Sequence, residues 1–178
     1  SALDAGIASV VKKFKGKEKM LIPVLMLLFA LGGSTYGMAE ETIPFYALLI
    51  PVMMAVGFDT VVAVAIVLVG SQVGCLASTV NPFATGVASQ AVGISMGEGI
   101  GLRFLMFVIL LAISIVYVYR YASKIEKDPT KSLVYNQRKE DMKHFDIEAI
   151  GRQEVITKKQ KHVNVLFFIT FGIMIISL

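Results

Sequence analysis

Two short polar stretches interrupt apolar runs and carry the side chains best suited to bind a small ion. Their candidate binding residues are Gly33, Ser34 and Thr35 in the first stretch, and Ser78, Thr79, Asn81 and Pro82 in the second. Pro82 lacks a backbone donor and pushes Asn81 out of the helical region, so a helix there must break and free backbone groups for a ligand. Hydroxyl, amide and carbonyl oxygens are the hard ligands that sodium requires. We predict that the two stretches form one site; the alternative is that the hydroxyls bond back to their own helices.

A pair of carboxylates, Glu40 and Glu41, follows the first stretch by about one helical turn. Between residues 20 and 119 the other charged side chains fall at predicted membrane interfaces, and these are Asp59, Glu98 and Arg103. An ionisable group at membrane depth is costly and is a functional candidate by default. The two glutamates would suit a proton, a sodium ion or a cationic substrate. The alternative places them in water on an extracellular loop.

The sequence carries no recognisable catalytic set. It has no Ser/His/Asp or Cys/His grouping with credible placement, no phosphate-binding glycine loop and no metal-ligand cluster. The single cysteine, Cys75, is interpreted as a packing residue, and His144 and His162 as solvated loop residues. We therefore expect no enzyme and no cofactor, with sodium or a proton as the coupling ion.

The composition is that of an integral membrane protein. Of 178 residues, 56% are hydrophobic and only 17% are charged, whereas soluble domains carry about a quarter charged residues. Residues 60–97 contain no charged side chain, and 38 residues of helix would extend roughly 57 Å, nearly twice a hydrocarbon core of about 30 Å. We therefore predict a helix that is unwound near its middle. The net charge of +4 comes from basic blocks that flank apolar segments, and does not indicate a nucleic-acid partner.

The predicted fold is an all-α, polytopic membrane protein. Five lysines mark residues 1–19 as a cytoplasmic amphipathic or juxtamembrane segment. The following segments are predicted to be a re-entrant helical hairpin over 20–57, a broken transmembrane helix over 60–93, a transmembrane helix over 102–121, a cytoplasmic linker over 122–162 and the start of the next transmembrane helix over 163–178. The first arm of the hairpin is expected to break at Gly32, and Asp59 to cap the helix that follows. Two ordinary spans joined by a loop are the alternative to the hairpin.

Three motifs make the sequence similar to the YfcC-type transporters, and the resemblance spans most of the chain. The motifs are Gly32-Gly-Ser-Thr-Tyr-Gly-Met-Ala-Glu-Glu-Thr42, Ala77-Ser-Thr-Val-Asn-Pro-Phe83 and Gly97-Glu-Gly-Ile-Gly-Leu-Arg103. This family contains anaerobic four-carbon-dicarboxylate carrier-like proteins and basic amino acid (arginine/ornithine) antiporters, within the ion transporter superfamily. The resemblance implies two inverted repeats, each with a re-entrant hairpin and a broken helix whose tips meet around substrate and coupling ion. Sodium/dicarboxylate relatives carry a Ser-Asn-Thr motif at these tips, which this chain matches only in part, so the substrate class stays open.

Residues and resemblance together predict one half of an inverted-repeat secondary active transporter in the bacterial cytoplasmic (inner) membrane. We expect it to move a basic amino acid such as arginine or ornithine by alternating access; a four-carbon dicarboxylate is the alternative substrate. A channel or a non-transporting membrane subunit is the competing class. The expected partners are the small-molecule substrate, the lipid bilayer and the remainder of the transporter, with a homodimer as a further option and no nucleic acid.

Overall fold

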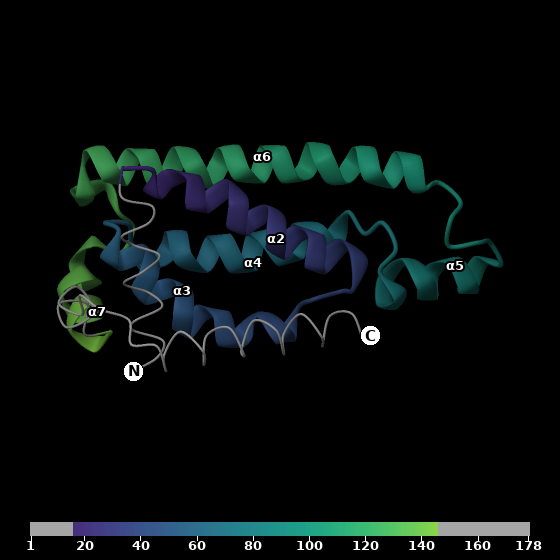
Figure 1. Ribbon diagram of the computed structural model, residues 1–178, viewed down its shortest axis with the longest axis horizontal. Helices are drawn as coiled ribbons and strands as arrows, with labels where there is room; N and C mark the ends of the chain where they lie inside the picture. Colours follow the sequence, from purple (N-terminus) through teal and green to yellow (C-terminus); the bar gives the residue numbers. More distant parts are fainter. Residues whose placement is uncertain (1–15, 146–178) are drawn as a thin grey trace, which may run out of the picture.

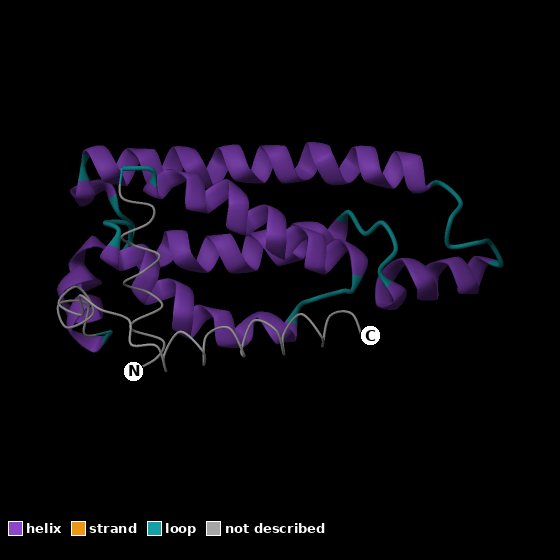
Figure 2. Ribbon diagram, in the orientation of Figure 1, coloured by secondary structure: helices purple, strands orange, loops and turns teal. Residues whose placement is uncertain are grey.

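The computed structural model describes residues 16–145, and within that range the regular elements are all helical (Figure 2). In chain order they are η1 (Glu18–Met20), α2 (Leu21–Thr35), η2 (Glu40–Thr42), α3 (Ile43–Ala55), α4 (Thr60–Leu76), η3 (Pro82–Gly86, a π-helical turn), α5 (Val87–Val92), α6 (Ile100–Lys127), η4 (Pro129–Lys131), η5 (Tyr135–Gln137) and α7 (Arg138–His144). The expected all-α class is confirmed for this part of the chain. Most of the predicted 1–19 segment, the second half of the 122–162 linker and the span predicted from residue 163 lie outside the described residues.

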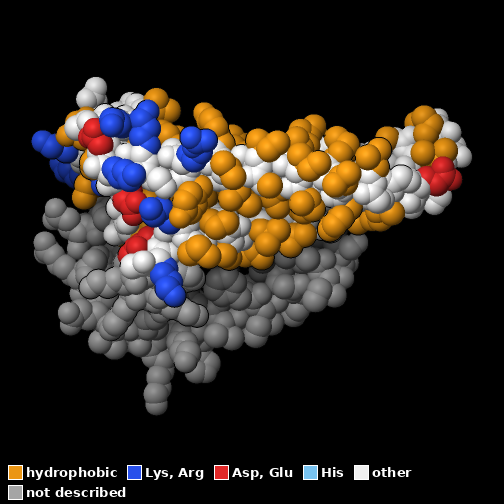
Figure 3. All heavy atoms as spheres, turned by 90° about the horizontal axis from the view of Figure 1, so that it is seen from above, with side chains coloured by type: hydrophobic (Ala, Val, Ile, Leu, Met, Phe, Trp, Pro, Cys, Tyr) orange, Lys and Arg blue, Asp and Glu red, His pale blue; other side chains and the backbone are white. Residues whose placement is uncertain are grey.

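Among residues 16–145, two helical stretches are long and apolar enough to cross a membrane, Glu18–Thr35 and α6. The 28 residues of α6 extend about 42 Å, more than the roughly 30 Å of a hydrocarbon core. In Figure 3 apolar side chains cover the length of this helix, while Lys and Arg gather at the end near α7. The basic side chains of this face thus gather at one end of the long apolar helix.

The helix predicted over 102–121 is longer at both ends in the structure. Its C-terminal extension carries Lys124 and Lys127 in the last turn, where positive charge is stabilised by the helix dipole. The helix stops at Lys127 because Asp128 precedes a proline and takes an extended conformation, with φ −146° and ψ 94°.

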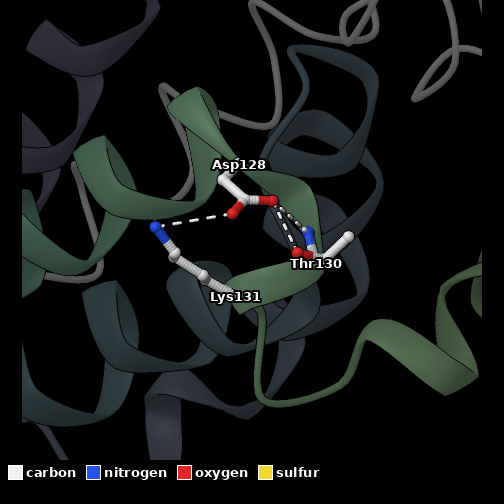
Figure 4. A network of polar contacts seen from close by, with 3 residues as sticks. All are labelled: Asp128, Thr130 and Lys131. Atoms are coloured by element: carbon white, nitrogen blue, oxygen red, sulfur yellow. Dashed lines mark hydrogen bonds and ion pairs between the residues drawn. The ribbon is translucent and has the colours of Figure 1, made fainter.

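Asp128 caps the short turn that follows α6 (Figure 4). Its Oδ1 accepts hydrogen bonds from the backbone N–H and the hydroxyl of Thr130, and its Oδ2 lies 3.4 Å from Nζ of Lys131. The hydrogen bond from the Thr130 hydroxyl is the main reason why the pKa of Asp128 lies below its ordinary value. The turn thus fixes the direction in which the linker leaves the helix.

The break in the first arm lies further along the chain than predicted. Gly32 and Gly33 do not end the helix, because α2 remains helical as far as Thr35. The chain leaves the helix at Tyr36 and Gly37, where Gly37 has a positive φ of 84° and its N–H donates to the carbonyl oxygens of Gly32 and Gly33, both at 3.1 Å. This is a glycine C-cap, which satisfies carbonyls at the helix end.

Gly33 lets the C-terminal halves of α2 and α4 approach each other closely (Figure 1). A Cβ atom on Gly33 would lie 2.2 Å from the carbonyl oxygen of Ser71, and one on Gly74 would lie 2.1 Å from that of Ala30. Gly70 and Gly74 form a Gly-xxx-Gly pair on α4, the spacing that lets membrane helices pack backbone to backbone. This contact sets the position of the end of α2 against the end of α4.

Asp59 starts α4 as predicted, since its Oδ1 accepts a hydrogen bond of 2.9 Å from the N–H of Val62. Its side chain is buried rather than exposed at an interface, and only 2% of its surface is accessible. The other carboxylate oxygen accepts from the hydroxyl of Tyr121 at 2.7 Å and from that of Ser132 at 2.6 Å. Asp59 therefore joins the start of α4 to the end of α6 and to the linker.

Candidate functional site

The two polar stretches meet where the end of α2 lies against the chain that follows α4. The carbonyl oxygen of Ser34 accepts hydrogen bonds from the N–H groups of Thr79 and Val80, at 3.1 and 3.2 Å. The Ser34 hydroxyl lies 3.0 Å from the Thr79 hydroxyl and 3.3 Å from the carbonyl oxygen of Ala77. Ser34 is 1% exposed, so these contacts are made away from solvent. The break after α4 is therefore held by the last turn of α2.

Asn81 ties the same two segments together with both ends of its amide. Its Nδ2 donates to the carbonyl oxygen of Gly33 at 3.2 Å, and its Oδ1 accepts from the N–H groups of Phe83 and Ala84 at 2.8 and 3.2 Å. The side chain is buried, and a Cβ atom on Gly37 would lie 2.8 Å from its Oδ1. Asn81 thus caps the π-helical turn, anchors it to α2 and packs against the turn of the first arm.

Ser78 points to a different neighbour. Its hydroxyl pairs with that of Thr85, which also donates to the carbonyl oxygen of Ser78 at 3.3 Å. Both residues line an open pocket of about 230 Å³ together with Cys75, Arg103 and Met106. The residues of the break therefore contact Ser34 on one side and border a pocket on the other.

Arg103 is a component of the site that the sequence interpretation missed. Its Nη1 donates to the carbonyl oxygen of Thr79 at 2.9 Å, while its Nη2 donates to the carbonyl oxygens of Met96 and Glu98. The guanidinium therefore ties the break to the loop before α6, instead of lying free at a membrane interface. A basic side chain within an apolar helix was the signal available in the sequence.

Of the predicted site residues, the structure brings together Gly33, Ser34, Thr79 and Asn81, with Ser78 adjoining them through the same break. Thr35 is exposed, and its hydroxyl bonds back to the carbonyl oxygen of Leu31 at 2.7 Å. Pro82 is exposed and begins the π-helical turn.

Glu40 and Glu41 lie at the start of η2 with exposed side chains. The Oε2 of Glu41 accepts a hydrogen bond of 3.1 Å from the N–H of Ala39. The meeting point of the two polar stretches, where Ser34 contacts Thr79 and Asn81 contacts Gly33, is called the crossed breaks below. Among the described residues, neither carboxylate contacts the crossed breaks through a hydrogen bond or an ion pair. Within residues 16–145 the structure therefore does not bring Glu40 and Glu41 into hydrogen-bonding contact with the Ser and Thr hydroxyls of the two stretches.

The site is rich in neutral oxygen atoms and amides and poor in charge. Within residues 16–145, no three His, Cys, Asp or Glu side chains come together in a way that would hold a metal ion. The chemistry that remains is recognition through hydroxyl, amide and carbonyl groups, next to one guanidinium. Such groups at broken helices bind small ions and polar molecules within a membrane.

Apolar helices long enough for a bilayer, and helix breaks that meet one another, are features of helical membrane proteins. The chain belongs to the DcuC family, described as C4-dicarboxylate anaerobic carrier, whose family model matches residues 1–178. This membership confirms the carrier family indicated by the three motifs.

Two curated relatives extend the comparison. A protein of Haemophilus influenzae, described as uncharacterized, is 38% identical over 178 residues, which are 98% of this chain and 34% of the relative. The "Putative basic amino acid antiporter YfcC" of Escherichia coli is 35% identical over 133 residues, 75% of this chain and 26% of that protein. The chain thus spans about a third or less of the length of these relatives. No solved structure matches the sequence.

Proposed function

We propose that this chain is part of a secondary active transporter that moves a small organic ion across the bacterial inner membrane by alternating access. The observation that supports this proposal most directly is the crossing of the two breaks, in which Ser34 meets Thr79 and Asn81 meets Gly33. Broken helices that meet in a membrane provide polar backbone groups at a depth where lipid offers none. The remainder of the longer transporter would complete the site, in a second, inverted repeat.

The proposed substrate is a basic amino acid such as arginine or ornithine. The name of the Escherichia coli relative, a basic amino acid antiporter, supports this choice. Glu40 and Glu41 would supply the negative charge for a cationic substrate or for a coupling ion, sodium or a proton. On this proposal residues 20–57 act as a re-entrant hairpin, and a shift of its tip against the break exposes the site to either side.

A four-carbon dicarboxylate is the second candidate substrate, because the family that matches the whole chain is described as a C4-dicarboxylate anaerobic carrier. The hydroxyls and freed amides of the two breaks suit an anion as well as a zwitterion. Either substrate requires the same crossed breaks, so the two candidates differ in the charge of the ligand and share the mechanism.

Uptake by the full-length protein in proteoliposomes tests the proposal. We expect saturable uptake that depends on a sodium or proton gradient, and competition by arginine but not by fumarate for the first candidate, with the reverse for the second. A channel would instead give uptake that does not saturate and does not respond to an imposed ion gradient. Unchanged uptake in the Glu40→Gln, Glu41→Gln and Asn81→Ala variants would contradict the assignment of these residues to the site.

A further inference from the structure

Arg103 carries a positive charge next to the break without a carboxylate partner among residues 16–145. All three of its hydrogen-bond acceptors are neutral carbonyl oxygens, on Thr79, Met96 and Glu98. Glu98 is the nearest acid in the sequence, but it contacts the guanidinium through its backbone and its side chain is exposed. Carbonyl groups satisfy N–H donors and leave the net charge uncompensated, which favours an anionic ligand.

The pocket beside Arg103 is lined by polar side chains but by no acid. Its polar lining residues are Arg103, Ser78, Thr85 and Cys75, and the rest are apolar: Leu76, Ala77, Ala84, Ala88 and Met106. No lining residue is acidic, so Arg103 is the charged group that borders the pocket directly. A carboxylate matches the planar fork of a guanidinium and also accepts from hydroxyls.

The guanidinium is positioned to exchange partners. Thr79 belongs to the break that Ser34 holds, so the contact to its carbonyl fixes one side of the guanidinium. Met96 and Glu98 lie in the loop of residues 93–99, whose side chains are exposed throughout. A carboxylate entering the pocket could therefore replace these two loop carbonyls while the contact to Thr79 remains.

We propose that Arg103, with Ser78 and Thr85, forms a subsite that binds a carboxylate group of the transported substrate. This inference rests on the proposed transport function and deepens it, because a carboxylate is common to a basic amino acid and to a dicarboxylate. The volume of about 230 Å³ lies below the roughly 300–1,000 Å³ of sites that enclose a whole ligand. The subsite thus holds one end of the substrate, and Arg103 distinguishes acids from their carboxylate-free analogues.

The first experiment measures this discrimination in the full-length protein in proteoliposomes. Arginine is compared with agmatine, which lacks the carboxylate, and fumarate with its diamide, as competitors of uptake. In the wild type, the acid of the transported class should compete at least about tenfold better than its analogue, as expected for a hydrogen-bonded charge pair. Arg103→Gln should remove this preference, and Arg103→Lys should restore only part of it, since lysine keeps the charge but loses the fork. Arg120→Gln, an exposed arginine on the same helix, is the matched control and should keep the preference.

The second experiment does not need an Arg103 variant to fold. Cys75 lines the pocket and is the single cysteine of these 178 residues, so its reaction with N-ethylmaleimide reports occupancy after other cysteines of the full-length protein are replaced. Arginine, succinate or acetate should slow the labelling of Cys75, whereas agmatine should not. Thr85→Val, which removes one pocket hydroxyl, should weaken this protection.

The outcomes separate the subsite from the transport function. Equal labelling rates with and without every carboxylate compound would overturn the subsite even if uptake is saturable. Discrimination between acid and analogue that survives in a transporting Arg103→Gln variant would overturn it as well. Carboxylate protection of Cys75 without any uptake would support the subsite and contradict the proposed transport.

Discussion

Ser34 and Thr79 are joined by hydrogen bonds through both their backbones and their side chains. The N–H of Thr79 lies 3.1 Å from the carbonyl oxygen and also 3.1 Å from the hydroxyl of Ser34, while the Thr79 hydroxyl approaches the same two atoms at 3.3 and 3.0 Å. Two residues 45 positions apart thus share one compact network. In this arrangement each break satisfies polar groups that the other has freed.

The first prediction concerns the strength of this network. Ser34→Ala and Thr79→Val each remove a hydroxyl and should each lower the free energy of unfolding by about 1 kcal/mol. Because the two hydroxyls contact each other, the double variant should lose less than the sum of the single losses. Chemical denaturation of the full-length protein in detergent measures this double-mutant cycle. Thr35→Val is the matched control, since that hydroxyl bonds only to its own helix; a control loss as large as that of Thr79→Val would contradict the role of the crossing.

The second prediction separates the two tasks of Asn81. Asn81→Asp keeps an oxygen that caps the N–H groups of Phe83 and Ala84 but places a negative charge against the carbonyl oxygen of Gly33. Asn81→Ala removes both interactions and should cost about 1–2 kcal/mol of stability from the lost cap alone. We expect uptake to fall in both variants, and the amides of residues 83 and 84 to exchange faster with deuterium only in Asn81→Ala. If these two amides exchanged equally fast in both variants, the capping oxygen would not be what protects them from exchange.

The third prediction tests the close approach of α2 and α4. Gly74→Ala would place a methyl group 2.1 Å from the carbonyl oxygen of Ala30, so the helices must move apart. Overpacking of this kind costs about 1–3 kcal/mol, and a lower melting temperature of the full-length protein should reveal it. Gly101→Ala is the control: its Cβ atom meets nothing within 4 Å, and alanine is the better helix former. Equal melting temperatures for the two variants would contradict the packing.

The fourth prediction concerns the turn at Asp128. Its pKa is lower in the folded protein than in the unfolded chain, so its stabilising contribution is present above about pH 3.9 and is lost as the pH falls through the folded pKa. Thr130→Val removes the hydroxyl that contributes most to this shift and should move the pKa of Asp128 back towards its ordinary value. Thr130→Ser keeps a hydroxyl and should leave the pKa low. Carbon-13 NMR of the aspartate carboxyl groups during an acid titration checks both variants; identical titration curves would exclude the hydroxyl as the cause.

Local chemistry explains how much of the fold could be predicted. The N-cap at Asp59 and the break near Pro82 depend on neighbouring residues alone, and the structure confirms both. Gly32 was expected to break α2 by the same local argument, but α2 stays helical through Gly33, which packs closely against α4, and the turn comes at Gly37. A glycine in a membrane helix serves either a break or a close contact, and only the partner helix decides between them.

The prediction of the candidate site was limited by contacts over long sequence separations. The meeting of the two polar stretches was predicted from their similar composition, but the specific pairing of Ser34 with Thr79 was not. Arg103 was assigned to an interface from its place near a helix end, yet its guanidinium reaches back 24 residues to Thr79. The sequence marks Arg103 as a basic side chain within an apolar helix, but it does not give the direction of this long side chain.

The length of α6 has a mechanical consequence. Near its start Arg103 donates a hydrogen bond to the break after α4, and near its end Tyr121 donates one to the buried carboxylate of Asp59. These two residues are 18 positions apart, about 27 Å along an uninterrupted helix. One continuous helix, α6, is therefore hydrogen-bonded to the chain at both ends of α4. A tilt of α6 that strains the hydrogen bond at one end of α4 would also change the geometry of the hydrogen bond at the other end.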